Sequence, residues 1–133
     1  MRTLTIKSHK QVELIDITHD VIKTILEDNI TEGLAVIYTP HTTAAITINE
    51  NADPDVSLDI IMGTDKLIPL RDDYRHLEGN SAAHIKSSLF GASETLIINN
   101  GKPVLGTWQG IYLFEHRIRS HHRSVLIRCL KVS

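Results

Sequence analysis

Short alternating patterns of hydrophobic and polar residues predict several strands along this chain. Residues 4–6 and 12–14 alternate in this way and predict a hairpin with its turn at 8–10. Asn100-Gly101 stands between two further hydrophobic runs and is typical of a tight hairpin turn. The remaining strands are predicted at 34–38, 43–48, 95–98, 103–105, 111–114 and 124–132.

Three segments carry helical signals. Thr18 is a candidate N-cap before hydrophobic residues spaced for one helical face, and Gly33 is expected to close this helix. Asp53-Pro54 predicts the start of a short helix whose buried face comes from residues 56–62. Residues 80–91 predict a capped helix that ends before Gly91, although their alternation also permits a strand. Strands and helices are mixed without regular alternation, which favours an α+β fold with a polar connection at 63–79.

Composition indicates one globular domain and excludes some classes of protein. The 133 residues are enough for one domain with a buried core. With a net charge of −2, the chain lacks the broad basic field of a protein that binds duplex nucleic acid. No signal-peptide core is apparent, and no hydrophobic run approaches the roughly 20 residues that span a membrane. Cys129 is the single cysteine and forms no internal disulfide, so we expect a soluble, cytoplasmic protein.

Eight histidines are many for this length, and two of them are candidate metal ligands. Neutral imidazole is the commonest protein metal ligand, and carboxylates complete such sites. The spacing of His76 and His84 is not a zinc signature, so a site would need a third ligand such as His41 or a carboxylate. The alternative is that each histidine lies on the surface or satisfies local hydrogen bonds.

Polar residues at the end of the strand at 43–48 form a second candidate. Asn49 and Glu50 leave the strand on opposite sides, and ends of strands commonly display functional groups. Asp53 is explained by its capping role. The alternative for the whole run is a turn rich in Asn and Asp.

Three later segments could bind an anion or an aromatic ring. Free amides at a helix start near Asn80 form a natural anion site, which Lys86 could reach from a short or bent helix; a plain N-cap and a solvated lysine are the alternative. Trp108, beside Gln109, could stack on a ring, but a buried anchor in a bulged strand is favoured. Residues 115–123 gather three arginines and three histidines around Glu115. They could bind phosphate groups, form a solvated hairpin tip or contact nucleic acid.

The segments HTTAAITINENADPDV at 41–56, HLEGNSAAHIKSSLFG at 76–91 and GKPVLGTWQGIYLFEHR at 101–117 resemble the YjbQ-like family. The resemblance extends over nearly the whole chain and implies one YjbQ-like domain over residues 1–133. It implies an α+β fold with a mixed β-sandwich, assembled as a homotrimer. Many relatives continue from the glutamate as Phe-Asp-Gly-Pro-Arg, whereas here His116, Arg117 and Ile118 follow Glu115.

Some members of that family are described as secondary thiamine-phosphate synthases, which join hydroxymethylpyrimidine diphosphate to thiazole phosphate and release pyrophosphate. The resemblance therefore implies a metal-assisted transferase, with zinc or magnesium as the divalent ion and a small phosphorylated substrate. The alternatives are a metal-dependent phosphate-ester hydrolase and a non-catalytic metal- or ligand-binding module. The implied residues are Glu50, Lys86 and Glu115 for catalysis, Asn49, Asn80, Trp108, Gln109 and Arg123 for substrate, and His41, His76 and His84 for metal.

Overall fold

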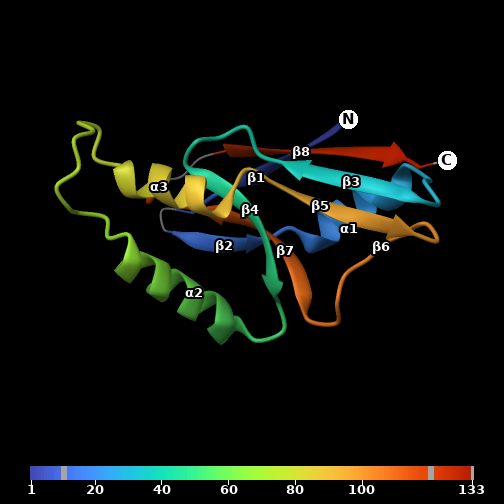
Figure 1. Cartoon of the computed structure of the whole chain (residues 1–133), viewed down its shortest axis with the longest axis horizontal. Coiled ribbons are helices and arrows are strands. Elements are labelled where there is room, and N and C mark those ends of the chain that lie inside the picture. Colours follow the sequence, from blue (N-terminus) through green and yellow to red (C-terminus); the bar gives the residue numbers. More distant parts are fainter. Residues whose placement is uncertain (10–11, 120–121, 133) are drawn as a thin grey trace.

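Two antiparallel sheets and three helices make up the described part of the computed structural model, which covers residues 1–9, 12–119 and 122–132 (Figure 1). The five-stranded sheet has the order β1-β8-β3-β5-β6, with bounds β1 Arg2–Lys7, β3 Gly33–Tyr38, β5 Ser93–Asn99, β6 Lys102–Pro103 and β8 His122–Lys131. The three-stranded sheet has the order β2-β7-β4, with bounds β2 Glu13–Asp16, β4 Ala44–Glu50 and β7 Gln109–Glu115. The helices are α1 Thr18–Glu27, α2 Pro54–Leu67 and α3 Ser81–Phe90. The predicted α+β class is confirmed.

Side chains from both sheets and from α1 form one hydrophobic core. Ile37 of β3, Ile127 of β8, Ile46 of β4 and Leu113 of β7 are fully buried in it, together with Ile25 of α1. In β7, the middle strand of its sheet, Gly110–Glu115 are buried without interruption. A strand covered on both faces has no reason to alternate, and this explains its continuous hydrophobic run.

The first predicted hairpin is wrong. β1 pairs with β8 in one sheet, whereas β2 pairs with β7 in the other, so the two strands are not partners. Both strands are short, and alternation identifies a strand but not its neighbour. The turn predicted at 8–10 lies partly outside the described residues. The hairpin at Asn100-Gly101 is confirmed: β5 pairs with β6, and both turn residues have positive φ.

The first helix ends earlier than predicted. α1 stops at Glu27, Asn29 takes a positive φ of 52°, and Gly33 is the first residue of β3. Thr18 is the first helical residue, and Ile17 occupies the cap position. Gly33 is required for packing, since a Cβ there would stand 2.1 Å from the carbonyl oxygen of Leu130 in β8.

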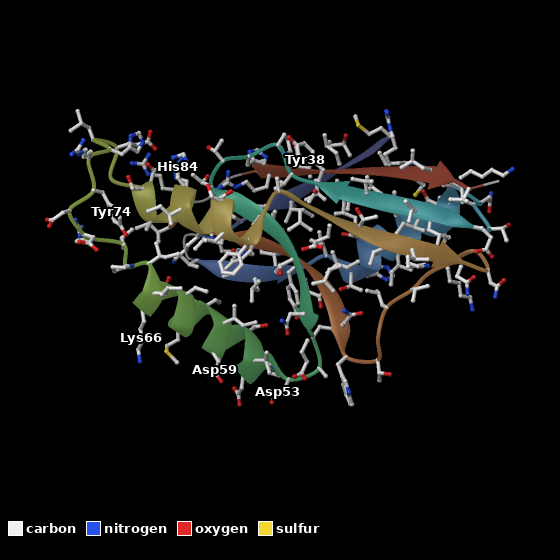
Figure 2. The ribbon with its side chains drawn as sticks, viewed as in Figure 1. Tyr38, Asp53, Asp59, Lys66, Tyr74 and His84 are labelled. Carbon is white, nitrogen blue, oxygen red and sulfur yellow. The ribbon has the colours of Figure 1, made fainter. Side chains whose placement is uncertain are left out.

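The second helix is longer and more exposed than predicted. Asp53 caps it as expected, accepting a hydrogen bond from the Asp55 amide at 2.9 Å. However, α2 continues to Leu67 and has no buried residue, so the expectation of a buried face was wrong. Figure 2 shows Asp59 and Lys66 on the side of α2 that faces away from the sheets.

The third helix is confirmed as a helix that begins after Asn80 and ends before Gly91. A connection of residues 68–80 joins it to α2. Within the described residues, none of these helices has the length and hydrophobicity needed to cross a membrane.

Two glycines provide a matched test of this packing. We expect Gly33→Ala to lower the free energy of unfolding by about 1–3 kcal/mol, because the new methyl group would overlap the β8 backbone. Gly63→Ala, in the middle of α2 with open space around it, should instead raise it by roughly 0.5–1 kcal/mol. Urea unfolding of both variants measures the difference, and equal effects would contradict the β3–β8 packing described here.

Candidate functional site

A hollow opens where the start of α3 meets the end of β7 and the start of β8. We call it the α3 hollow; it has a volume of about 320 Å³ and is lined by His41, Thr43, Glu78, Asn80, His84, Arg117 and Arg123. A second cavity of about 160 Å³, the inner cavity, continues from it and shares Glu78, Asn80 and Arg117. Its other polar lining residues are Arg71, His116 and Arg119. Residues from four distant segments of the chain therefore form one continuous concave site.

A buried ion pair forms the floor of the α3 hollow. The guanidinium of Arg123 donates to both oxygens of Glu115, from Nε at 2.8 Å and from a terminal nitrogen at 2.5 Å. The same terminal nitrogen donates to the hydroxyl of Thr43 at 2.8 Å. Glu115 is fully buried and Arg123 is 5% exposed. A carboxylate held in this way orients the arginine and is poorly placed to act as a base towards a ligand in the hollow.

The position of Arg123 follows from strand parity. Arg123, Val125 and Ile127 are buried, whereas Ser124 and Leu126 between them are less so. Because side chains alternate across a strand, Arg123 is held on the inward face with the core residues. Glu115 is available as its partner because β7 ends at the same edge of the fold.

Sequence reasoning missed His116, which is 3% exposed and lines the inner cavity. Neither ring nitrogen has a hydrogen-bond partner among the described residues. Burial, followed by the positive charges of Lys86 and Arg123, lowers the pKa of His116 from 6.5 to about 3. The ring is therefore neutral at pH 7, with one N–H donor and one acceptor nitrogen. The continuous hydrophobic run just before His116 could have indicated its burial. Such a run predicts a strand that is covered on both faces, and the cover can extend past its last residue.

Lys86 is a buried cation between two helices. Its side chain is 3% exposed and forms an ion pair with Asp65 of α2. Its ammonium also contributes to the lowered pKa of His116. As placed, Lys86 attaches α3 to α2 and adds to the effect of burial that keeps His116 neutral. Its predicted catalytic role stays a prediction.

The three predicted metal ligands lie near one another in two pairs. His41 and His84 line the α3 hollow, and His84 also contacts His76 with ring centroids 5.5 Å apart. In Figure 2, His84 at the start of α3 and Tyr74 in the preceding connection lie at the same end of the molecule. His41 accepts a hydrogen bond at Nε2 from the Ser124 amide at 2.9 Å.

One contact of His41 bears on the predicted metal ion. Nε2 of His41 accepts the Ser124 amide, so this nitrogen is already engaged within the chain. Within the described ranges, no three His, Cys, Asp or Glu side chains come together as a metal site. The side-chain positions within a single chain therefore do not support the predicted divalent ion, which stays a prediction.

The remaining predicted residues lie at the other end of the small sheet. Glu50 pairs with Gln109 at one end of the β4–β7 ladder, and Ala44 pairs with Glu115 at the other. Six residues of strand separate the two ends by roughly 20 Å. The structure therefore places Asn49, Glu50, Trp108 and Gln109 apart from the α3 hollow of the same chain.

Local contacts explain most of that second group. Asn49 accepts a hydrogen bond from the Glu50 amide at 2.7 Å, and Gln109 accepts one from the Gly106 amide at 2.7 Å. Trp108 is 62% exposed, so the interpretation of it as a buried anchor was wrong. These side chains support turns, and Trp108 presents its ring to the surface.

The chain is similar to other proteins across nearly its whole length. A family model described as "UPF0047 protein YjbQ-like" matches residues 2–132. A UPF0047 protein of Methanocaldococcus jannaschii is 60% identical over 110 residues, covering 83% of this chain and 80% of the relative. UPF0047 protein YugU of Bacillus subtilis is 54% identical over 116 residues, covering 86% and 88%.

Solved structures show the same similarity. A crystal structure of an uncharacterized conserved protein of the YjbQ/UPF0047 family from Clostridium acetobutylicum has a TM-score of 0.93 and 49% identity, covering 98% of this chain and 100% of that chain. A YbjQ-like protein of unknown function from Sulfolobus solfataricus has a TM-score of 0.93 and 29% identity, covering 98% and 96%.

The buried neutral histidine predicts a particular dependence of stability on pH. The unfolded chain protonates His116 near its ordinary pKa of 6.5, whereas the folded chain resists protonation down to about pH 3. Between these values the unfolded state binds one more proton, so stability falls as the pH falls, by about 1.4 kcal/mol per pH unit from this residue. We expect His116→Phe to lose less stability than the wild type between pH 7 and pH 4.5.

Urea midpoints at several pH values measure this slope. His19→Asn is the matched control, because His19 is exposed on α1, and its slope should equal that of the wild type. A His116→Phe slope as steep as the wild-type slope would show that His116 is accessible to protons in the folded protein.

Proposed function

The chain belongs to the UPF0047 protein YjbQ-like family, and on that premise we propose that it is a transferase acting on a small diphosphate ester. The substrate's diphosphate occupies the α3 hollow and leaves as pyrophosphate. In the reaction that the family resemblance implies, hydroxymethylpyrimidine diphosphate is joined to thiazole phosphate, which yields thiamine phosphate.

The observation that supports this proposal is the convergence of four arginines on one site. Arg123 and Arg117 line the α3 hollow, and Arg71 and Arg119 line the inner cavity that continues from it. Among the described residues, Glu78 and Glu115 form ion pairs with these guanidinium groups, so positive charge is in excess in this part of the site. The forked donors of arginine match phosphate oxygens in geometry and charge.

The start of α3 adds to this preference for anions. The first amides of a helix have no acceptor within the helix, and the helix dipole favours negative charge at this end. The Asn80 carbonyl accepts from the amides of Ala83 and His84, which leaves the amides of Ser81 and Ala82 as the first-turn donors.

The reaction requires little proton transfer by residues of the protein. The bond between the pyrimidine methylene carbon and the diphosphate oxygen breaks, and the oxygen keeps the electron pair. A bond then forms between that carbon and the thiazole ring nitrogen. The residues must stabilise the negative charge that develops on the leaving diphosphate, which is the role of donors held in place before the reaction. Arg123, fixed by Glu115, is a donor of this kind.

We also propose that the chain forms a homotrimer through the outer face of the five-stranded sheet. Leu34 of β3 lies between Leu130 of β8 and Ile97 of β5 in the register of the sheet. All three are large hydrophobic side chains with 38–59% of their surface exposed. A continuous apolar stripe across a sheet face is typical of an interaction surface.

Removing one arginine should weaken binding of the leaving group. We expect Arg117→Leu to bind inorganic pyrophosphate about 10–100-fold more weakly, since a charge-assisted hydrogen bond contributes about 1.5–3 kcal/mol. The fold should tolerate the change, because the partner of Arg117 is Glu78, which is half exposed and stays solvated. Isothermal titration calorimetry measures the affinity.

Lys23→Leu is the control, because it removes one exposed positive charge from α1, away from the site. Equal pyrophosphate affinity in the two variants would contradict the proposed site. Turnover separates the reactions: thiamine phosphate formed from the two precursors supports the transferase, whereas phosphate released from a panel of phosphoesters without it favours the hydrolase.

Charging the apolar stripe should disrupt the assembly. We expect the wild type to elute with the mass of three chains, and Leu34→Lys with Ile97→Glu to elute as a monomer that keeps its secondary structure. Light scattering coupled to size exclusion measures the mass, and circular dichroism checks the fold. A wild type that is monomeric at all accessible concentrations would refute the homotrimer.

A further inference from the structure

The inner cavity contains polar groups that the binding of an anion does not explain. Asn80 Oδ1 and both ring nitrogens of His116 are buried and have no hydrogen-bond partner among the described residues. Both residues line the same cavity. Leaving a buried polar atom unsatisfied costs about 1–3 kcal/mol, so two such groups facing one space indicate that a ligand completes them.

The side chain of Asn80 is not needed to cap its helix. It occupies the N-cap position of α3, yet it makes no capping hydrogen bond, and the contacts to the first turn come from its backbone carbonyl. The usual reason for an asparagine at this position is therefore absent, and the side chain is left for the cavity.

His116 packs against two aromatic rings. Its ring packs against Phe114 at a centroid distance of 4.4 Å and against Phe90 at 5.9 Å. Because burial, together with the charges of Lys86 and Arg123, opposes its protonation, the ring offers one N–H donor and one acceptor nitrogen instead of a positive charge.

These properties restrict the chemistry of the occupant. A cation would meet Arg71, Arg117 and Arg119 around the cavity. A phosphate or carboxylate oxygen would face the lone pairs of Asn80 Oδ1, which is an acceptor and cannot donate. A neutral group with an N–H donor beside an acceptor nitrogen satisfies both side chains.

We propose that the inner cavity is a subsite for the uncharged ring of the substrate, which presents an amino group beside a ring nitrogen. The amino group donates to Asn80 Oδ1, and the ring nitrogen accepts from the N–H of His116. An aminopyrimidine has this edge, and a cavity of about 160 Å³, roughly the volume of five waters, takes one such ring. The inference rests on the proposed function for the position of the diphosphate, which lies next to the ring in the α3 hollow. It places the ring here instead of against the exposed Trp108.

The test measures binding of 4-aminopyrimidine by saturation-transfer NMR, with unsubstituted pyrimidine as the matched ligand that lacks the amino donor. We expect the wild type to bind 4-aminopyrimidine, and pyrimidine at least about tenfold more weakly. Asn80→Leu and His116→Phe should each weaken 4-aminopyrimidine about tenfold. Asn80→Asp keeps an acceptor oxygen and should restore binding to within about threefold of the wild type.

Each alternative gives a different result. Loss of 4-aminopyrimidine binding in Trp108→Ala, with binding intact in Asn80→Leu, would overturn the proposal in favour of the tryptophan. The proposal would also be overturned if the wild type bound neither ligand or bound both equally. The inner cavity would then be a solvent-filled space. If His116→Phe does not fold, the Asn80→Leu and Asn80→Asp pair decides alone, since neither change removes a helix cap.

Pyrophosphate calorimetry on the same variants keeps this inference separate from the proposed function. The wild type should bind pyrophosphate whether or not it binds 4-aminopyrimidine, because the arginines of the α3 hollow do not depend on a ring in the inner cavity. Intact pyrophosphate binding without aminopyrimidine binding refutes only the ring subsite, whereas absent pyrophosphate binding refutes the proposed function.

Discussion

The buried ion pair between Arg123 and Glu115 is the interaction on which the site depends. Arg123 belongs to the five-stranded sheet and Glu115 to the three-stranded sheet, so the pair ties the two sheets together where their strands end. Burying two charges is costly unless the geometry is good and the remaining donors are satisfied. The geometry is good, because the fork is bidentate and Thr43 accepts a further hydrogen bond from the guanidinium. A rigid guanidinium is thus held at the floor of the α3 hollow.

Positive charge also controls the neutral residue beside this pair. Lys86 and Arg123 lie near His116 and add to the effect of burial, so the ring stays uncharged. The site therefore has two halves with different chemistry. Arginines line both the hollow and the inner cavity, but only the inner cavity also holds the buried neutral groups of Asn80 and His116 without hydrogen-bond partners among the described residues. A substrate with an anionic end and an uncharged polar ring matches both halves.

The length of β4 and β7 explains why two groups of predicted site residues lie far apart in the structure. The polar residues at the end of β4 and the start of β7 share one end of the ladder, while Glu115 and Thr43 share the other. Strands carry their two ends about 20 Å apart over six residues. A reading of motifs along the chain groups such residues together, although an extended strand separates them.

The sequence by itself determined most elements, because periodicity, caps and turn residues act over a few positions. The Asp53-Pro54 helix start, the helix that follows Asn80 and the Asn100-Gly101 turn are all present. Asn80 became a candidate from its place at a helix start, and Arg123 from the resemblance to the family. Only the tertiary structure decided which strands pair, that His116 is buried between cations and that Trp108 is exposed. Those facts depend on contacts between segments far apart in the chain, and no local pattern of side chains specifies them.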